Sequence, residues 1–392
     1  MIKNNATKIL IFILFILALL SGYNFFQKPF IKMIEKKQAE LKLAQSMPVV
    51  TPVVTTNEDA VFSNLTTEQK IWQLISVPVS LSEYTTATTS AELEFIYQHN
   101  PGFVTIFGSK LDLETVKNFT NNLPASEAGF KTLVAVDHEG GTVQRLTGDG
   151  FTILPSWANL CMETAAEKIS LFETSARELR SAGINIVFAP VIDVPRVGSF
   201  LKSRACQSQV ASLDTAESYI KAFGEQGIFP VVKHYPGIGS LTKDLHDYQA
   251  EVFPGSQDTL PFQKVFEVFP NIGVMTAHVI VPDRTDGLPC SLSSVCLDPF
   301  PIHFPDVMIF VDALEMKSAV TQDENGEDVS LATTAKMALM AGNNVLVFGD
   351  KLNYQELELI VGELVKVYDE DSEFRSKVDA SVYKILDKKI FD

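Results

Sequence analysis

Cysteine and basic residues are scarce in this chain of 392 residues. It contains four cysteines, too few and too scattered for a disulfide scaffold, and none belongs to a Cys-x-x-Cys pair of the kind that binds zinc. Lys and Arg number 32 against 48 Asp and Glu, a formal net charge of −16, which disfavours a broad phosphate-binding surface. We therefore expect no metal site and no nucleic-acid partner.

The usual nucleotide-binding motifs are also missing. Neither G-x-G-x-x-G nor G-x-x-x-x-G-K-[ST] follows the first apolar runs of the body, so nucleotide binding has no sequence signature here. Hydrophobic residues make up 46% of the chain and charged residues 20%, which excludes a protein that is disordered throughout. The length fits either two or three domains or one large α/β barrel.

One long apolar run stands out near the N-terminus. Residues 9–20 read ILIFILFILALL, and a weaker stretch extends the run to Phe26, just before Lys28. Its length of about 18 residues is just enough to cross a bilayer core of about 30 Å. No small-x-small cleavage site follows, so we expect residues 1–27 to be an uncleaved membrane anchor, with a cleaved signal peptide as the alternative. The rest of the chain would then lie outside the cytoplasmic membrane, in the cell envelope.

Residues 28–60 differ in composition from the rest of the chain. A Lys/Glu/Gln/Ala-rich stretch with helical propensity is followed by MPVVTPVVTTNEDA, where Pro and Thr favour an extended backbone. We interpret this segment as a stalk between the anchor and a body formed by residues 61–392. The alternative is that the Lys/Glu-rich part packs on the body as an ordinary surface helix.

The body alternates short apolar runs rich in Val, Ile and Phe with longer amphipathic segments, which is typical of βαβ units. Seven or eight such units over about 330 residues suit a single (β/α)8 TIM-like barrel, here preceded by the N-terminal transmembrane anchor. Gly183 and Gly342 stand where two helices would end. We expect strands over 102–107, 133–137, 184–189, 230–234, 272–278, 307–312 and 345–348, and helices over 165–182, 214–227, 331–341 and 354–367.

Polar side chains stand at the ends of four expected strands. They are Asp137, the pair Lys233 and His234, His278, and Asp312. In a barrel the carboxyl ends of the strands share one mouth, so these residues predict a common site. Each also has a structural interpretation: Asp137 could bind turn amides, Asp312 could cap a turn with Glu315, and His278 could be a hydrogen-bonded core residue.

Four sequence strings carry a more specific signal: VDHEGGTVQRL, KHYPGIGSLTKDLH, VMTAHVIVP and VDALEM. In their order and at these strand positions, they resemble glycoside hydrolase family 3, in particular its β-N-acetylhexosaminidase branch. The resemblance extends over roughly residues 65–349. It implies a barrel that is active without a second domain and needs no cofactor.

The resemblance also implies roles for individual residues. Asp312 matches the family's catalytic Asp and would be the nucleophile, while His246 paired with Asp244 would be the acid/base. Arg196 is a nearby competitor for the role given to Arg204, and Asp193 would support a loop. The residues expected to bind the sugar are Asp137, Arg145, Arg204, Lys233 and His234.

Some positions depart from the family pattern. Ile238 and Ser240 replace a His and an Asp, Val311 stands where Ser or Thr is common, and Asn344 stands where Asp is more typical. The leading hypothesis is a membrane-anchored, retaining exo-β-N-acetylglucosaminidase that acts on peptidoglycan fragments (muropeptides) or related N-acetylglucosamine-containing oligosaccharides, most simply as a monomer. Two alternatives remain open: an impaired barrel that only binds cell-wall sugar, and a β-N-acetylglucosaminide phosphorylase.

Overall fold

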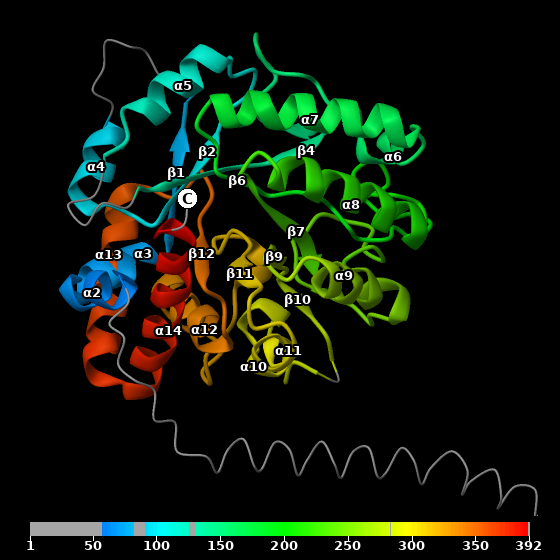
Figure 1. Cartoon of the computed structure of the whole chain (residues 1–392). Coiled ribbons are helices and arrows are strands. Elements are labelled where there is room, and N and C mark those ends of the chain that lie inside the picture. Colours follow the sequence, from blue (N-terminus) through cyan, green and yellow to red (C-terminus); the bar gives the residue numbers. More distant parts are fainter. Residues whose placement is uncertain (1–56, 82–90, 125–130, 283, 391–392) are drawn as a thin grey trace, which may run out of the picture. The chain divides into compact units, whose positions relative to one another are not determined.

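Eight parallel strands close into a barrel in the computed structural model, which describes residues 57–81, 91–124, 131–282 and 284–390 (Figure 1). Around the barrel the strand order is β1-β12-β11-β9-β7-β6-β3-β2. The described residues belong to one unit, which begins at Asn57. The barrel strands are β1 (Ile75–Ser80), β2 (Phe103–Phe107), β3 (Leu133–Val136), β6 (Ile186–Val187), β7 (Phe229–Tyr235), β9 (Gly273–Thr276), β11 (Met308–Val311) and β12 (Val345–Val347).

Helices cover the outside of this barrel, and their ends follow ordinary capping chemistry. Thr164 and Glu167 form a capping box at the start of α7, and Gly342 ends α12 in the left-handed conformation at φ 115°. The helices are α2 (Asn57–Asn64), α3 (Thr67–Gln73), α4 (Ala91–His99), α5 (Leu113–Asn121), α6 (Trp157–Leu160), α7 (Ala165–Ser181), α8 (Gln209–Gly224), α9 (Ser256–Val268), α10 (Ser294–Leu297), α11 (Pro299–His303), α12 (Leu331–Ala341), α13 (Tyr354–Glu370) and α14 (Ser372–Ile390).

Smaller elements are inserted between the barrel strands. Two short strands after β3 form a hairpin. Two more strands, one in the loop after β7 and one in the loop after β9, pair with each other. They are β4 (His138–Gly140), β5 (Val143–Gln144), β8 (Ala250–Glu251) and β10 (Val279–Ile280), with 3-10 turns η1 (Cys290–Leu292) and η2 (Lys317–Ala319).

The barrel interior is filled by side chains. The Phe310 ring of β11 meets the Phe103 ring of β2 and the ring of Phe188, just after β6, with centroids 5.8 Å apart in both pairs. These strands are not neighbours in the barrel, so the rings meet across its inside. The barrel is therefore a packed core, and a site can form only above it, where the loops follow the strands.

The prediction of seven strands and a barrel is confirmed, and one strand was not anticipated. Strand β1 contains Pro78, which cannot donate a backbone hydrogen bond, yet it pairs with both β2 and β12. At the start of the body, α2 begins at Asn57, before residue 61 where the body was expected to begin.

The prediction of a transmembrane anchor in front of the barrel must be corrected. In the described part of the chain, no helix is long and apolar enough to cross a bilayer. Residues 1–27, on which the prediction rests, lie outside the described residues, and so do residues 28–56 of the expected stalk.

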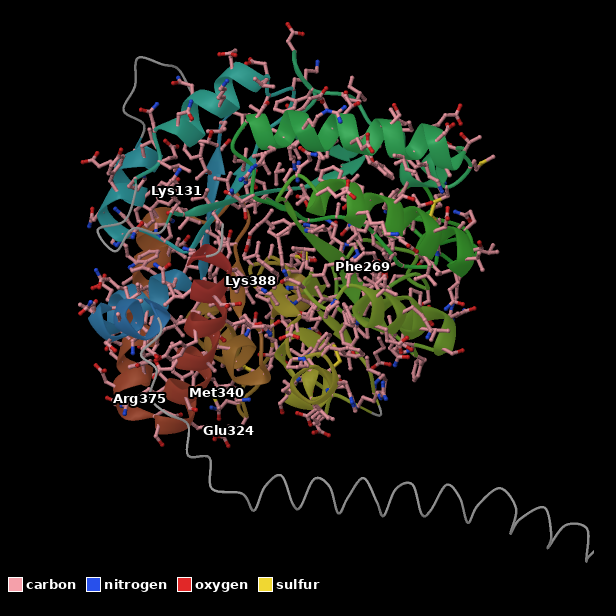
Figure 2. All side chains as sticks on the ribbon, viewed as in Figure 1. Lys131, Phe269, Glu324, Met340, Arg375 and Lys388 are labelled. Carbon is pink, nitrogen blue, oxygen red and sulfur yellow. A yellow bond between two sulfur atoms is a disulfide. The ribbon has the colours of Figure 1, made fainter. Side chains whose placement is uncertain are left out.

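All four cysteines are paired in disulfides (Figure 2). Cys161, at the end of α6, bonds to Cys206, and Cys290 in η1 bonds to Cys296 in α10. Cys206, Cys290 and Cys296 are buried among the apolar side chains, so the disulfides reinforce a hydrophobic core and do not replace it.

Candidate active site

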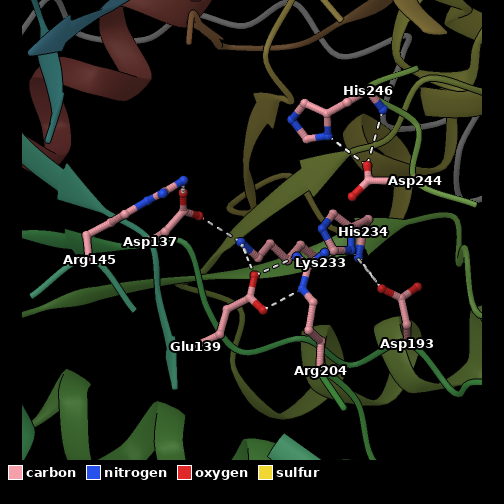
Figure 3. Close-up of polar contacts among 9 residues, drawn as sticks. All are labelled: Asp137, Glu139, Arg145, Asp193, Arg204, Lys233, His234, Asp244 and His246. Carbon is pink, nitrogen blue, oxygen red and sulfur yellow. Dashed lines mark hydrogen bonds and ion pairs between the residues drawn. The ribbon is translucent and has the colours of Figure 1, made fainter. Parts of the chain in front are cut away.

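A pocket of about 450 Å³ opens at the carboxyl ends of the barrel strands. Its volume lies in the range of small-molecule sites, about 300–1,000 Å³. The structure brings all eight sequence-predicted site residues together in the lining of this pocket: Asp137, Arg145, Arg204, Lys233, His234, Asp244, His246 and Asp312. Figure 3 shows seven of them with two supporting carboxylates, Glu139 and Asp193.

The inner wall of the pocket is a network of buried charges centred on Lys233. Its ammonium group lies 2.9 Å from Asp137 Oδ1 and 2.7 Å from Glu139 Oε1, and only 3% of its side chain is exposed (Figure 3). Burial alone would raise the pKa of Asp137, but Lys233, Arg145 and Arg204 together lower it to about 2. Asp137 is therefore a fixed carboxylate that can accept hydrogen bonds from sugar hydroxyls.

Glu139 is a functional residue that sequence reasoning missed. It lies two residues after Asp137, and its buried carboxylate accepts two hydrogen bonds from Arg204, 2.9 Å from Nε and 2.7 Å from Nη2. Burial favours the neutral acid, but the positive charges of Lys233 and Arg204 outweigh this effect and lower the pKa of Glu139. The signal in the sequence was the alternation D-H-E, which puts both carboxylates on the same side of the chain.

His234 is oriented by Asp193. Oδ2 of Asp193 accepts from the backbone N–H of His234 at 2.9 Å and lies 2.8 Å from Nδ1 of its ring, while Oδ1 accepts from the Ile238 N–H at 2.7 Å. A carboxylate only accepts, so Nδ1 carries the proton and Nε2 is the other ring nitrogen available to the pocket. Asp193 thus supports both a pocket residue and the start of the next loop, in line with its expected supporting role.

Arg196, the competitor of Arg204, does not belong to the pocket lining. Its guanidinium pairs with Asp258 at 2.6 Å, whereas Arg204 lines the pocket.

The loop after β7 carries the pair Asp244 and His246 at the rim. Both side chains are exposed, by 50% and 68%, and Nδ1 of His246 lies 2.7 Å from Asp244 Oδ1. This hydrogen bond is the main reason why the pKa of His246 is raised and that of Asp244 is lowered to about 2. Between the two residues, Leu245 is buried and lines the pocket, which seats the loop.

Asp312 follows the last residue of β11. Its backbone N–H donates to the Thr276 carbonyl at 3.1 Å, and its Oδ1 accepts from the Ala313 N–H at 2.9 Å. Among the described residues, none donates a hydrogen bond to the other oxygen, Oδ2. Asp312 also helps to raise the pKa of His246, so the two groups feel each other's charge.

His278, the remaining polar strand end, does not line the pocket. It is buried behind Asp312, with Nδ1 2.7 Å from Ser291 Oγ and Nε2 3.2 and 3.1 Å from the carbonyl oxygens of Asp312 and Ala313. This geometry fits the structural interpretation of His278.

Taken together, the pocket holds a carboxylate with a free oxygen, an imidazole held by a second carboxylate, and an inner wall of fixed donors and acceptors. Glycoside hydrolysis with retention requires a nucleophile, an acid/base and a hydroxyl-binding wall. The arrangement supplies candidates for all three.

Comparisons with known proteins identify the family of the chain. The sequence model of the "Glycosyl hydrolase family 3 N terminal domain" matches residues 66–387. The chain is 34% identical over 208 residues to a "Beta-hexosaminidase" of Psychromonas ingrahamii, covering 50% of this chain and 61% of that protein, and 33% identical over 236 residues to one of Idiomarina loihiensis, covering 56% and 68%. The chain thus spans only about three-fifths of the length of the Psychromonas relative.

A solved structure agrees on the fold. The chain superposes on Mycobacterium tuberculosis LpqI with a TM-score of 0.71 and 23% identity, over 85% of this chain and 96% of that one. The match of the family sequence model over most of the body, together with the relatives, shows that this chain belongs to glycosyl hydrolase family 3.

Proposed function

We propose that the protein is a retaining exo-β-N-acetylglucosaminidase that removes terminal N-acetylglucosamine through a covalent glycosyl-Asp312 intermediate. The observation that carries this proposal is that Asp312, with one oxygen free, lines the same pocket as the Asp244–His246 pair. The curated relatives named β-hexosaminidase support the substrate class.

In the first step, Asp312 Oδ2 attacks the anomeric carbon while His246 gives a proton to the departing oxygen. Nδ1 of His246 is engaged by Asp244, so Nε2 is the nitrogen that faces the leaving group. The raised pKa keeps a larger share of His246 protonated near neutral pH, which suits a general acid. The bond from Asp312 to the sugar forms as the bond to the leaving oxygen breaks.

In the second step, His246 accepts a proton from a water molecule, and the resulting hydroxide displaces Asp312 from the sugar. Two inversions at the same carbon give overall retention. On the inner wall, Asp137 accepts from sugar hydroxyls, and Arg145, Arg204, Lys233 and His234 donate to hydroxyls and to the acetamide group.

The two disulfides support an extracytoplasmic location for this activity. Disulfides persist in secreted and cell-envelope proteins and are rare in the reducing cytosol. We propose peptidoglycan fragments, which contain N-acetylglucosamine, as the substrate in that compartment.

The test uses the full chain and a chromogenic N-acetyl-β-glucosaminide. We expect release of N-acetylglucosamine, with the β-anomer as the first product by NMR, and no release by Asp312→Asn. Adding inorganic phosphate should leave the product unchanged; a sugar 1-phosphate would identify a phosphorylase instead. Sugar binding without any release would identify a binding barrel and overturn the proposal.

A further inference from the structure

A chain of contacts runs from the Cys290–Cys296 disulfide to the carboxylate of Asp312. It passes through Ser291, next to Cys290, and through the buried ring of His278. None of these three residues lines the pocket, so their arrangement is not explained by contact with sugar.

The first link fixes which ring nitrogen of His278 carries the proton. Nε2 lies 3.2 Å from the Asp312 carbonyl and 3.1 Å from the Ala313 carbonyl, and a carbonyl oxygen only accepts. Nε2 is therefore protonated. Burial lowers the pKa of His278 and favours the neutral ring, so Nδ1 is an acceptor and the Ser291 hydroxyl donates to it at 2.7 Å.

The second link connects the hydrogen bonds of His278 to the Asp312 carboxylate through one peptide group. The carbonyl of Asp312 and the N–H of Ala313 belong to the same planar peptide, so fixing the carbonyl also fixes the N–H on its far side. That N–H donates to Asp312 Oδ1 at 2.9 Å. His278 thereby sets the direction of the group that holds one carboxylate oxygen and leaves the other free.

The third link holds Ser291 itself. Its backbone N–H donates to the Ala277 carbonyl at 3.3 Å, and its carbonyl accepts from Asn343 Nδ2 at 2.7 Å. The adjacent Cys290 is fully buried and tied to Cys296 in α10. The disulfide therefore limits rotation of the short turn from which the Ser291 hydroxyl points to His278.

We infer that His278 and Ser291 are positioning residues for the nucleophile, and that the Cys290–Cys296 disulfide fixes Ser291 for this task. The inference rests on the proposed role of Asp312. The second disulfide joins Cys161 to Cys206, two residues after Arg204 of the inner wall, and so ties down the segment that carries Arg204 instead. The two disulfides should thus affect different kinetic constants.

The central test compares Ser291→Ala with Ser293→Ala, a buried serine in the same segment. Ser291→Ala should lower kcat by about 10- to 100-fold, the range expected for a small misplacement of a reacting group, with KM and the melting temperature close to wild type. Ser293→Ala should retain kcat. His278→Gln keeps an N–H donor and should be less impaired than His278→Leu.

The disulfides are tested by two double variants, Cys290→Ala with Cys296→Ala and Cys161→Ala with Cys206→Ala. The first should lower kcat with little change in KM, whereas the second should raise KM with little change in kcat. Equal changes in kcat for both pairs would show general loosening and overturn the assignment of the Cys290–Cys296 disulfide.

Failure of this inference can be told apart from failure of the proposed function. If Asp312→Asn turns over like wild type, Asp312 is not the nucleophile, and both the proposed function and this inference fail. If Asp312→Asn is inactive but Ser291→Ala and His278→Leu fold and keep the wild-type kcat, only the inference fails.

Discussion

The charged groups of the inner wall and those of the rim loop differ in how deeply they are buried and in what holds them. Lys233 on the inner wall and its partner Glu139 are almost fully buried and are held by ion pairs with Asp137 and Arg204. On the rim, Asp244 and His246 are exposed, and the hydrogen bonds that hold the pair are those between its own two members. The wall charges are thus tied to one another by several ion pairs, whereas the rim pair is held only locally.

This difference matches the two tasks of the proposed reaction. Sugar hydroxyls must be bound by groups that are already oriented, and fixed buried charges do this without reorganising. The acid/base must first give a proton and later take one from water, so it needs solvent access and a pKa near neutrality. Removing wall residues should therefore affect folding and binding, and removing rim residues should affect proton transfer.

The largest effect is expected at Asp312, which belongs to neither group. Replacing Asp312 by Asn removes the attacking oxygen and should lower kcat by about 10⁴-fold or more, equal to roughly 5.5 kcal/mol in the barrier. Steady-state kinetics on a chromogenic substrate measures this, with sugar affinity by calorimetry as the control. A variant with normal turnover would show that Asp312 is not the nucleophile. It would then contradict the roles proposed for both the inner wall and the rim.

The inner wall is tested by Lys233→Met. The change leaves Asp137 and Glu139 without their shared cation in a buried place and should lower the free energy of unfolding by about 3–5 kcal/mol. The matched control is Lys243→Met on the exposed loop, which should change stability by less than about 0.5 kcal/mol. Denaturant unfolding measures both, and equal losses would erase the distinction between wall and rim.

The rim is tested by His246→Ala. This variant should fold normally and lose about 10²-fold or more in rate on a substrate with a poor leaving group, because proton donation is then required. On an activated leaving group the loss should be much smaller. If both substrates slow equally, His246 does not act as the acid.

A smaller effect is expected from Asp244→Asn. The carboxylate raises the pKa of His246, so its removal should lower that pKa and move the alkaline limb of kcat/KM to lower pH. The shift should be a fraction of a pH unit because the pair is half-exposed. Glu251→Gln, at an exposed carboxylate outside the pocket lining, is the control and should leave the profile in place.

Much of the fold could be predicted from the sequence because the spacing of apolar residues and the local composition indicate strands and helices. Runs of Val, Ile and Phe marked seven strands, and the polar residues at the ends of three of them marked the pocket. At a fourth strand end, His278 is buried outside the pocket lining. Strand β1 was missed because Pro78 and two serines interrupt its apolar pattern. Its place in the barrel depends on pairing with β12, from the other end of the body, and no local pattern reports that.

The supporting residues of the site could not be predicted in the same way. Glu139 contacts Arg204 and Lys233, both distant in sequence. Asp193 contacts His234 and Ile238. Such contacts arise when separate loops meet above the barrel, so they depend on three-dimensional closure. The pairing of Cys161 with Cys206, 45 residues apart, has the same origin.

The most direct test of the central claim is to trap the glycosyl-enzyme. A 5-fluoro-N-acetylglucosaminyl fluoride has a good leaving group for the first step and a fluorine that slows the second, so an intermediate should accumulate. After proteolysis, mass spectrometry should find the added sugar on Asp312. A sugar adduct on any other residue, or none while the enzyme turns over the probe, would contradict the mechanism.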